Sequence, residues 1–267
     1  STFADPMLNI LNALVFVCYE PSTNNGAAKT AACAALHFLA CHSPNLVAMG
    51  TEDIGIAEAL IYVIQTGDGG GDARANACSA VCHLCSAQAN RARLGSPNCK
   101  LLVSLVGVLG TSEIKSIVFA CSAMGFLAVA HENQKYMASN ELGLLYAIVQ
   151  LLDVDKGKAR EYCCSITRSL SSAISNKLFM AADHLGLVKA LINVMKDDRG
   201  KARANACASV CNLAIATMNK VPMAKPALGL VKALVYVIKT DKSEARVNSC
   251  AALSYLAVAM ENKTVLL

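Results

Sequence analysis

The apolar residues of the chain recur at the spacing of helices. Between residues 187 and 196 they fall at 187, 188, 191, 194 and 195, which places them on one face of an α-helix. Turn-forming residues follow at 197–200, and a second helical pattern covers 201–216. A short segment at 219–224 precedes the next copy of the pattern. No stretch alternates with period two, so we predict helices and no β-sheet.

Three residue types repeat in register along the chain. A cysteine recurs every 43 residues after a first interval of 45, a leucine follows each cysteine by six residues, and an asparagine follows each leucine by six. The six sets are Cys33, Leu39 and Asn45; Cys78, Leu84 and Asn90; Cys121, Leu127 and Asn133; Cys164, Leu170 and Asn176; Cys207, Leu213 and Asn219; Cys250, Leu256 and Asn262. A fixed period of this length is the signature of stacked repeats. We therefore predict about six copies of one helical unit.

A glycine recurs where the longer helix of each unit begins. It stands at Gly55, Gly143, Gly186 and Gly229, and Lys100 takes its place in the second copy. A glycine here indicates a tight corner between helices, where a Cβ is unfavourable. The longer first interval is explained by a glycine-rich loop at 67–72, and 21–26 is predicted to form a similar connection in the first copy.

These segments resemble the armadillo repeat family over about residues 7–267. The Asn-Lys pairs at 176–177, 219–220 and 262–263 resemble the start of its first helix. The pattern Gly-Leu-Val-x-Ala-Leu at 186–191 and 229–234 resembles its second helix. The pattern Ala-x-x-x-Cys-Ala-x-x-x-x-Leu-Ala, matched at 203–214 except at its first residue, resembles its third. HEAT repeats are the nearest competitor, but they have two helices and lack the short Asn-Lys element.

The resemblance implies an all-α, right-handed α-solenoid of about six three-helix repeats that forms a single domain over residues 1–267. The chain opens in what resembles a second helix, at 7–17, and stops at 265–267 inside a first helix. Solenoids need polar capping repeats, and neither end supplies one. We expect further chain or a partner to cover both ends.

Composition limits the environment of the chain. Hydrophobic residues make up 55% of it, aromatic residues only 5%, and tryptophan is absent. Most of the 13 cysteines lie inside apolar helical patterns, which favours reduced, buried thiols. Reduced thiols indicate an intracellular protein, for which we predict the cytoplasm, with the nucleus or an organelle as alternatives. No apolar run reaches the length of a membrane span. A net charge of +5 is too small to require a nucleic-acid partner.

The third helix of each repeat carries a stripe of polar and aromatic residues. Positions −6, −2, +1 and +5 from the repeat cysteine lie one above another at helical spacing. The resemblance implies that third helices line a groove for extended peptides, where amides clamp the backbone and aromatic rings seat side chains. The candidate groove residues are Asn76, His83, Phe126, Lys158, Tyr162, Lys201, Asn205, Asn212, Asn248 and Tyr255. The competing interpretation is an ordinary solvated helix face.

Two branches of the family bind different peptides. Importin-alpha-like members carry a Trp-x-x-x-Asn ladder, but here only Asn212 matches it, which argues against nuclear-import cargo. Beta-catenin-like members hold acidic segments with basic residues. A basic residue recurs at position −4, toward the flank of the third helix, so an acidic partner is one interpretation and ordinary surface charge is the other. The residues concerned are Lys29, Arg74, Arg160, Arg203 and Arg246, with Ile117 as the one gap.

No arrangement of residues predicts catalysis, a cofactor or a metal. The segment 26–30 lacks the glycines and the preceding strand of a phosphate-binding loop. Cys78, Cys82 and Cys85 share a helical face, but no second Cys/His pair at matching spacing appears nearby, so core packing is favoured over a metal site. The five histidines show no triad pattern.

We therefore predict a non-enzymatic scaffold that binds an extended segment of a partner protein, acidic in one interpretation, along its third helices. The alternative is a structural subunit of a larger assembly that contacts neighbours through its ends or its convex face. No small-molecule substrate and no nucleic acid are expected as partners.

Overall fold

The computed structural model describes residues 6–21, 26–154 and 157–266, without the side chains of 6–8 and 265–266. The described residues form helices joined by short turns, and no β-strand occurs among them, as the helical periodicity predicts. The chain divides into two compact units, unit 1 (Ser1–Asn133) and unit 2 (Gln134–Leu267). Each is described by itself below. The predicted connection at 21–26 and the chain end at 267 lie largely outside the described residues.

Unit 1 contains two complete repeats and the second and third helices of another. Its second helices are α1 (Pro6–Tyr19), α4 (Ile56–Thr66) and α7 (Leu101–Leu109), and its third helices are α2 (Ala27–Ala40), α5 (Gly70–Ser86) and α8 (Ile114–Ala128). Short first helices precede α4 and α7, namely α3 (Asn45–Met49), and α6 (Gln88–Leu94) with the turn η2 (Pro97–Cys99). Helix α9 (His131–Met137) spans the boundary between the units.

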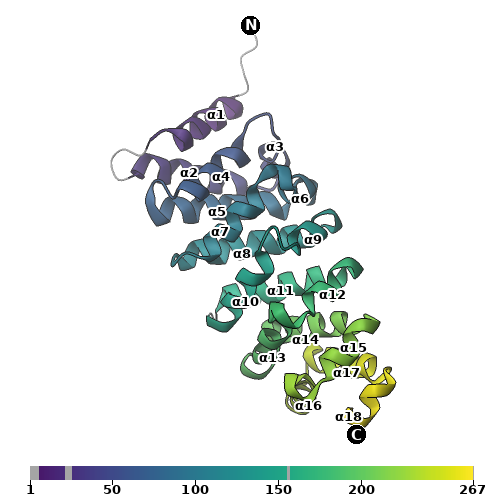
Figure 1. The fold of residues 1–267 in the computed structure, drawn as a ribbon. Coiled ribbons are helices and arrows are strands. Elements are labelled where there is room, and N and C mark those ends of the chain that lie inside the picture. Colours follow the sequence, from purple (N-terminus) through teal and green to yellow (C-terminus); the bar gives the residue numbers. More distant parts are fainter. Residues whose placement is uncertain (1–5, 22–25, 155–156, 267) are drawn as a thin grey trace. The chain divides into compact units, whose positions relative to one another are not determined.

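Unit 2 has the same order of elements (Figure 1). Its second helices are α10 (Leu144–Val154), α13 (Leu187–Asp197) and α16 (Leu230–Thr240), and its third helices are α11 (Lys158–Ser172), α14 (Gly200–Ala214) and α17 (Glu244–Ala257). The first-helix elements are η3 (Ile174–Asn176) with α12 (Lys177–Met180) and η4 (Asp183–Leu185); α15 (Thr217–Ala224) with η5 (Pro226–Leu228); and η6 (Met260–Asn262) with α18 (Lys263–Leu266). The predicted three-helix repeat is confirmed in both units.

Like helices pack side by side within each unit. In unit 1, α2, α5 and α8 form one layer and α1, α4 and α7 another; in unit 2, α11, α14 and α17 pack in one layer and α10, α13 and α16 in the other (Figure 1). The small repeat cysteines lie at the contacts between third helices, where Cys33, Cys78, Cys121, Cys164 and Cys207 are fully buried. Close packing of small apolar side chains therefore forms the core. Cys250 departs from this pattern and is exposed, because α17 is the last third helix of the described chain.

The repeat asparagines join successive repeats by their side-chain amides. The Nδ2 atom of Asn176 donates to the carbonyl of Leu170 in the third helix just before it (3.0 Å) and to that of Gln134 in the first helix one period earlier (3.0 Å). Asn90, Asn133, Asn219 and Asn262 make the same pair of bonds, and all five are buried. Each buried amide therefore satisfies its own two donor hydrogens and ties the end of one third helix to the first-helix element one period earlier. We call this set the asparagine ladder.

The predicted glycine corner is confirmed by the backbone. Gly55, Gly143, Gly186 and Gly229 all have φ between +71° and +76°, the left-handed region. A Cβ added at Gly143 would meet nothing within 4 Å, so conformation rather than crowding favours glycine there. Lys100 adopts the same conformation with φ +59°, at a cost of about 1–2 kcal/mol.

The glycine-rich segment at 67–72 is only partly a loop. Helix α5 already begins at Gly70, so the loop is confined to residues 67–69 and the extra length extends the helix at its N-terminus. Gly26 packs against this loop so closely that a Cβ on Gly26 would overlap the Cα of Gly69. No helix in the described part of the chain is long and apolar enough to cross a membrane.

Candidate functional site

The exposure of the third helices follows the predicted stripe. We call positions −6, −2, +1 and +5 of the third helices, with their immediate neighbours, the third-helix face of each unit. Position −6 is exposed in each of the last five repeats, and positions −2 and +5 are partly or fully exposed in all six. Position +1 is partly exposed in four repeats, whereas Ser79 and Ala208 are buried there. The candidate surface therefore uses three positions on α5 and α14 and four on the other third helices of the last five repeats.

In unit 2, this face carries cations and amides on three adjacent helices. Lys158 and Lys201 are exposed at the starts of α11 and α14, and Tyr162 is half-buried one turn after Lys158. Lys158 pairs with Glu161 (3.0 Å), and this contact raises the pKa of the lysine. Tyr255 on α17 is 38% exposed.

A polar network connects the three helices of this face. Arg168 on α11 donates from Nη1 to Oδ1 of Asn205 on α14 (3.1 Å) and pairs through Nη2 with Glu244 on α17 (3.3 Å). Both charged partners are about half exposed. Arg168 was not predicted from the sequence. It lies four residues after Cys164, beside the predicted stripe rather than on it.

The other amides of the unit 2 face bond loosely to neighbouring helices. Nδ2 of Asn248 donates to the carbonyl of Ala204 at 3.5 Å, and Nδ2 of Asn212 donates to Oγ of Ser171 at 3.2 Å. The carbonyl of Asn212 accepts from the buried Lys177 (2.8 Å), whose pKa is lowered by burial. Long hydrogen bonds are weak, so these half-exposed amides can exchange their present partners for a ligand at low cost.

The third-helix face of unit 1 carries fewer charges and more rings. Asn76 is half-exposed and its Nδ2 donates to the carbonyl of Thr30 (3.4 Å). Phe126 lies under the guanidinium of Arg91, with the ring centroid 5.7 Å from Cζ. His83 sits beside His37, with ring centroids 5.1 Å apart, and both rings are half-exposed. Burial, followed by the neighbouring His83, lowers the pKa of His37.

Comparisons with known proteins identify the fold of the chain. No protein-family model matches the chain, and no curated protein sequence matches it either. Solved structures do match. A computationally designed armadillo repeat protein for modular peptide recognition aligns over 92% of this chain and 99% of its own, with a TM-score of 0.78 and 19% identity. A designed armadillo repeat protein in complex with the peptide (KR)4 aligns over the same shares, with a TM-score of 0.77 and 18% identity.

The chain has the armadillo repeat fold. This confirms the all-α solenoid of about six three-helix repeats that the cysteine, leucine and asparagine register predicts. Sequence identities below 20% establish the fold alone. What the third helices of this chain bind must therefore be argued from the chain's own residues.

Four of the five basic residues at position −4 of the armadillo repeats pair with acids of the chain itself, which argues against the interpretation that this row holds an acidic segment of a partner. Arg160 is 3% exposed and pairs with Asp198 (2.8 Å); Arg203 is fully buried and pairs with Asp241 (3.2 Å). In unit 1, Lys29 pairs with Asp68 (2.5 Å) and Arg74 with Glu113. Each acid comes from the turn before the next third helix, 38 or 39 residues later. These pairs join successive repeats.

Arg246 is the exception among these cations. It is half-buried on α17, and no acid of the described chain pairs with it. Its Nε atom is buried without a hydrogen-bond partner. The sequence placed position −4 at the flank of the helix, and the flank turns out to face the neighbouring repeat rather than solvent.

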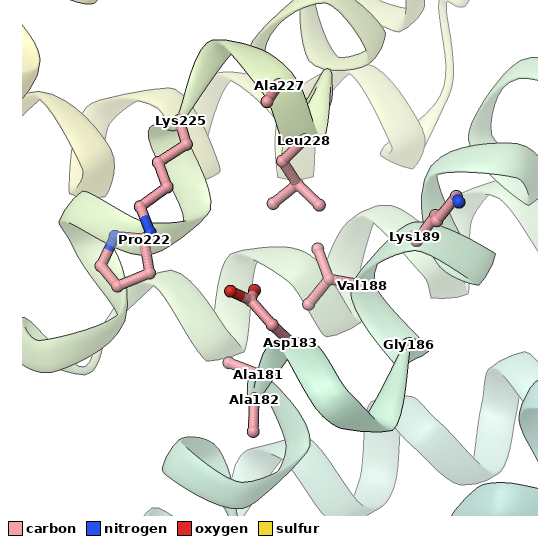
Figure 2. Close-up of a pocket in the computed structure, with 10 residues that line it drawn as sticks. All are labelled: Ala181, Ala182, Asp183, Gly186, Val188, Lys189, Pro222, Lys225, Ala227 and Leu228. Carbon is pink, nitrogen blue, oxygen red and sulfur yellow. The ribbon is translucent and has the colours of Figure 1, made fainter.

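A separate pocket of about 280 Å³ lies in unit 2 between the short first-helix elements (Figure 2). Asp183, Pro222, Lys225 and Leu228 contribute to its lining, together with Val188 and Lys189 at the start of α13. Figure 2 shows the carboxylate of Asp183 near the centre of the space, with Lys225 and Lys189 on opposite sides. The pocket is partly open to solvent, and it includes no residue of the third-helix face.

Proposed function

We propose that this chain is a non-enzymatic protein-interaction scaffold that binds an extended segment of a partner protein along its third-helix face. The observation that carries the proposal is the regular exposure of polar side chains on α11, α14 and α17. Lys158 and Lys201 lie one period apart, as do Asn205 and Asn248, and Asn212 lies two helical turns after Asn205. A recurrent row of amides suits a ligand that is itself periodic, such as the backbone of an extended peptide.

The dimensions of the two partners agree. Packed helices lie about 8–10 Å apart, and an extended chain advances about 3.3 Å per residue. Each third helix therefore meets about every third residue of the peptide. On α14 and α17 an asparagine side chain can donate to a backbone carbonyl and accept from a backbone N–H. The rings of Tyr162 on α11 and Tyr255 on α17 supply apolar contact for side chains.

The charge of the unit 2 face favours an acidic segment. Lys158, Arg168 and Lys201 are exposed on it, whereas Arg160 and Arg203, which were predicted for this role, are buried. Glu161 and Glu244 already pair with Lys158 and Arg168, so a peptide carboxylate would compete with them for these cations. The proposed partner is thus an extended peptide with carboxylates spaced to reach Lys201 and Arg168.

The test is selection of short random peptides against the whole chain, followed by affinity measurement with fluorescence anisotropy. We expect selected peptides to be acidic and to bind at least about tenfold more weakly to the variant Asn205→Ala/Asn212→Ala/Asn248→Ala, since each lost hydrogen bond costs about 0.5–1.5 kcal/mol. A matched control is Lys189→Ala/Asn193→Ala, which removes exposed polar side chains from α13.

Two results would contradict the proposal. One is equal affinity of the selected peptides for the triple variant and the control. The other is a preference of the chain for the (KR)4 peptide over an acidic peptide of the same length. That result would contradict an acidic partner, while the triple variant would still test whether the face binds a peptide.

One observation favours a second function, that of a subunit in a larger assembly. The corner between third and first helices in unit 2 exposes apolar side chains in successive repeats: Ile174, Leu178, Ile215, Met218, Val221, Val258 and Met260. Ile174 is 86% exposed and Met218 is 73% exposed. Exposed apolar residues grouped in this way are typical of protein contacts. If Ile174→Ser/Met218→Ser/Met260→Ser abolishes partner binding while the asparagine variant does not, this corner is the working surface.

A further inference from the structure

Three side chains with metal-binding atoms meet on the third-helix face of unit 1. His37 lies in the last turn of α2, Cys41 directly follows that helix, and His83 lies in the last turn of α5, which packs against α2. Nε2 of His37 is 3.8 Å from Sγ of Cys41, and Nε2 of His83 is 3.6 Å from the same sulfur. The ligand atoms of all three residues lie within 4.8 Å of one another.

These separations match those of a tetrahedral zinc site. With Zn–S near 2.3 Å and Zn–N near 2.0–2.1 Å, the sulfur and a nitrogen of such a site lie about 3.6 Å apart. The observed distances of 3.6 and 3.8 Å therefore allow one ion to sit between the three atoms with little movement of either helix.

A fourth residue holds one of the rings in place. Oγ of Ser79, one helical turn before His83, lies 3.0 Å from Nδ1 of His37. When Nδ1–H of His37 donates to this hydroxyl, Nε2 keeps its lone pair and faces Cys41. Metal-binding histidines characteristically fix their second nitrogen by such a bond, which sets the tautomer and the orientation of the ring.

We propose that His37, Cys41 and His83 bind a Zn²⁺ ion, with the fourth position open to water or to a ligand atom of a partner. One thiolate and two imidazoles suit zinc, whereas Ca²⁺ and Mg²⁺ require oxygen ligands. Binding releases the thiol proton of Cys41 to solvent as the Zn–S bond forms, and no electron is transferred. Cys41 is exposed and both histidines are half-exposed, so the ion can enter from solvent.

The site differs from the cysteine cluster of the same helix. Cys78 and Cys85 are fully buried in the core, and Cys82 bonds to Ser122 (3.2 Å). Among the described residues, the His37, Cys41 and His83 group is the one place where three metal-binding side chains converge. Because His83 occupies position +5, the ion would lie on the surface where unit 1 would contact a peptide.

The experiment uses the whole chain, stripped of metal under reducing conditions. Zn²⁺ is titrated in competition with a chromophoric chelator, and Co²⁺ is used as a spectroscopic probe for thiolate-bound, tetrahedral coordination. We expect one equivalent bound, with thiolate-to-cobalt charge transfer. Cys41→Ser and His83→Gln should each lose at least about tenfold in affinity, and Ser79→Ala should lose about tenfold through the freed ring of His37.

The matched control is Cys250→Ser/His184→Gln, which removes an exposed thiol and an exposed histidine from unit 2. Circular dichroism of the metal-free variants checks that each one folds. Retention of zinc affinity by both Cys41→Ser and His83→Gln, or absence of a saturable equivalent in the parent chain, would overturn the proposal. So would an equal loss of affinity in the control variant.

Discussion

Units 1 and 2 share their internal contacts and differ in what they expose. Both contain buried asparagines that bond across repeats, and both contain a basic residue at position −4 paired with an acid of the next repeat. On the third-helix face, however, unit 1 presents His37, Cys41 and His83, whereas unit 2 presents lysines, Arg168 and amides. The residues that join repeats are fixed by the period, while the exposed positions vary from repeat to repeat and can specialise.

The largest expected effect is on the free energy of unfolding, and it differs between the ion pairs at position −4 of the two units. Arg203→Ala should lower the free energy of unfolding by about 3–5 kcal/mol, because it leaves the carboxylate of Asp241 nearly buried without its partner. Lys29→Ala in unit 1 should cost less, about 2 kcal/mol, since Asp68 is 29% exposed against 11% for Asp241 and stays better hydrated. Urea unfolding followed by circular dichroism measures both.

Lys201→Ala is the control for this pair, because its side chain is exposed and its loss should change stability by less than about 0.5 kcal/mol. The double variant Arg203→Met/Asp241→Leu should recover much of the loss, since it removes both charges together. Equal losses for Arg203→Ala and Lys29→Ala would show that partner exposure does not set the difference.

A smaller effect is expected from the asparagine ladder. Asn176→Ala should cost about 2 kcal/mol, because two buried hydrogen bonds from its side-chain amide are lost. Asn45→Ala should cost about 1 kcal/mol, since Asn45 is half-buried and makes one such bond, to Leu39. Thermal unfolding and amide hydrogen exchange near residue 134 report the change. Asn176→Asp keeps the shape but removes the donating amide, so a stable Asn176→Asp variant would contradict this explanation.

The smallest effect, one of reactivity rather than stability, compares the thiols of the two units. Burial raises the pKa of Cys78 and of Cys164 to about 12, and that of Cys207 to about 11, so these thiols stay protonated and unreactive near neutral pH. Labelling of the folded chain with a thiol reagent should therefore reach Cys41 and Cys250 first. Zn²⁺ should slow labelling of Cys41 in unit 1 and leave Cys250 in unit 2 unchanged, as mass spectrometry of peptides can show. Equal protection of both would contradict the comparison.

The sequence predicts the armadillo fold well because the repeat amplifies weak signals. One cysteine on an apolar helix indicates little, but six in register locate every third helix. The glycine corner was also predictable, since a positive φ favours glycine strongly. The exception at Lys100 was visible as a substitution, although only the backbone shows that the lysine keeps the left-handed conformation.

The candidate site was less predictable. A helical period gives the direction in which a side chain leaves its own helix, but not which side chains of the neighbouring helix lie beside it. Arg203 was identified as a recurrent cation, but its partner Asp241 lies 38 residues further on. His37 lies in the last turn of α2 and Cys41 directly follows that helix, while His83 comes from the neighbouring helix, 42 residues after Cys41. Pairs of this kind become visible only when residues one period apart are compared directly.

The asparagine ladder also determines where the chain can change in length. The segment from each repeat leucine to its asparagine is held at both ends by one amide, so a residue inserted there would move the amide away from its carbonyls. The turn between second and third helices and the start of the third helix carry no such amide. The first 45-residue interval takes up its two additional residues in this region, where they lengthen α5 at its N-terminus. Natural insertions, epitope tags or grafted loops therefore belong in these turns, where a longer chain can be accommodated while the amides keep their register.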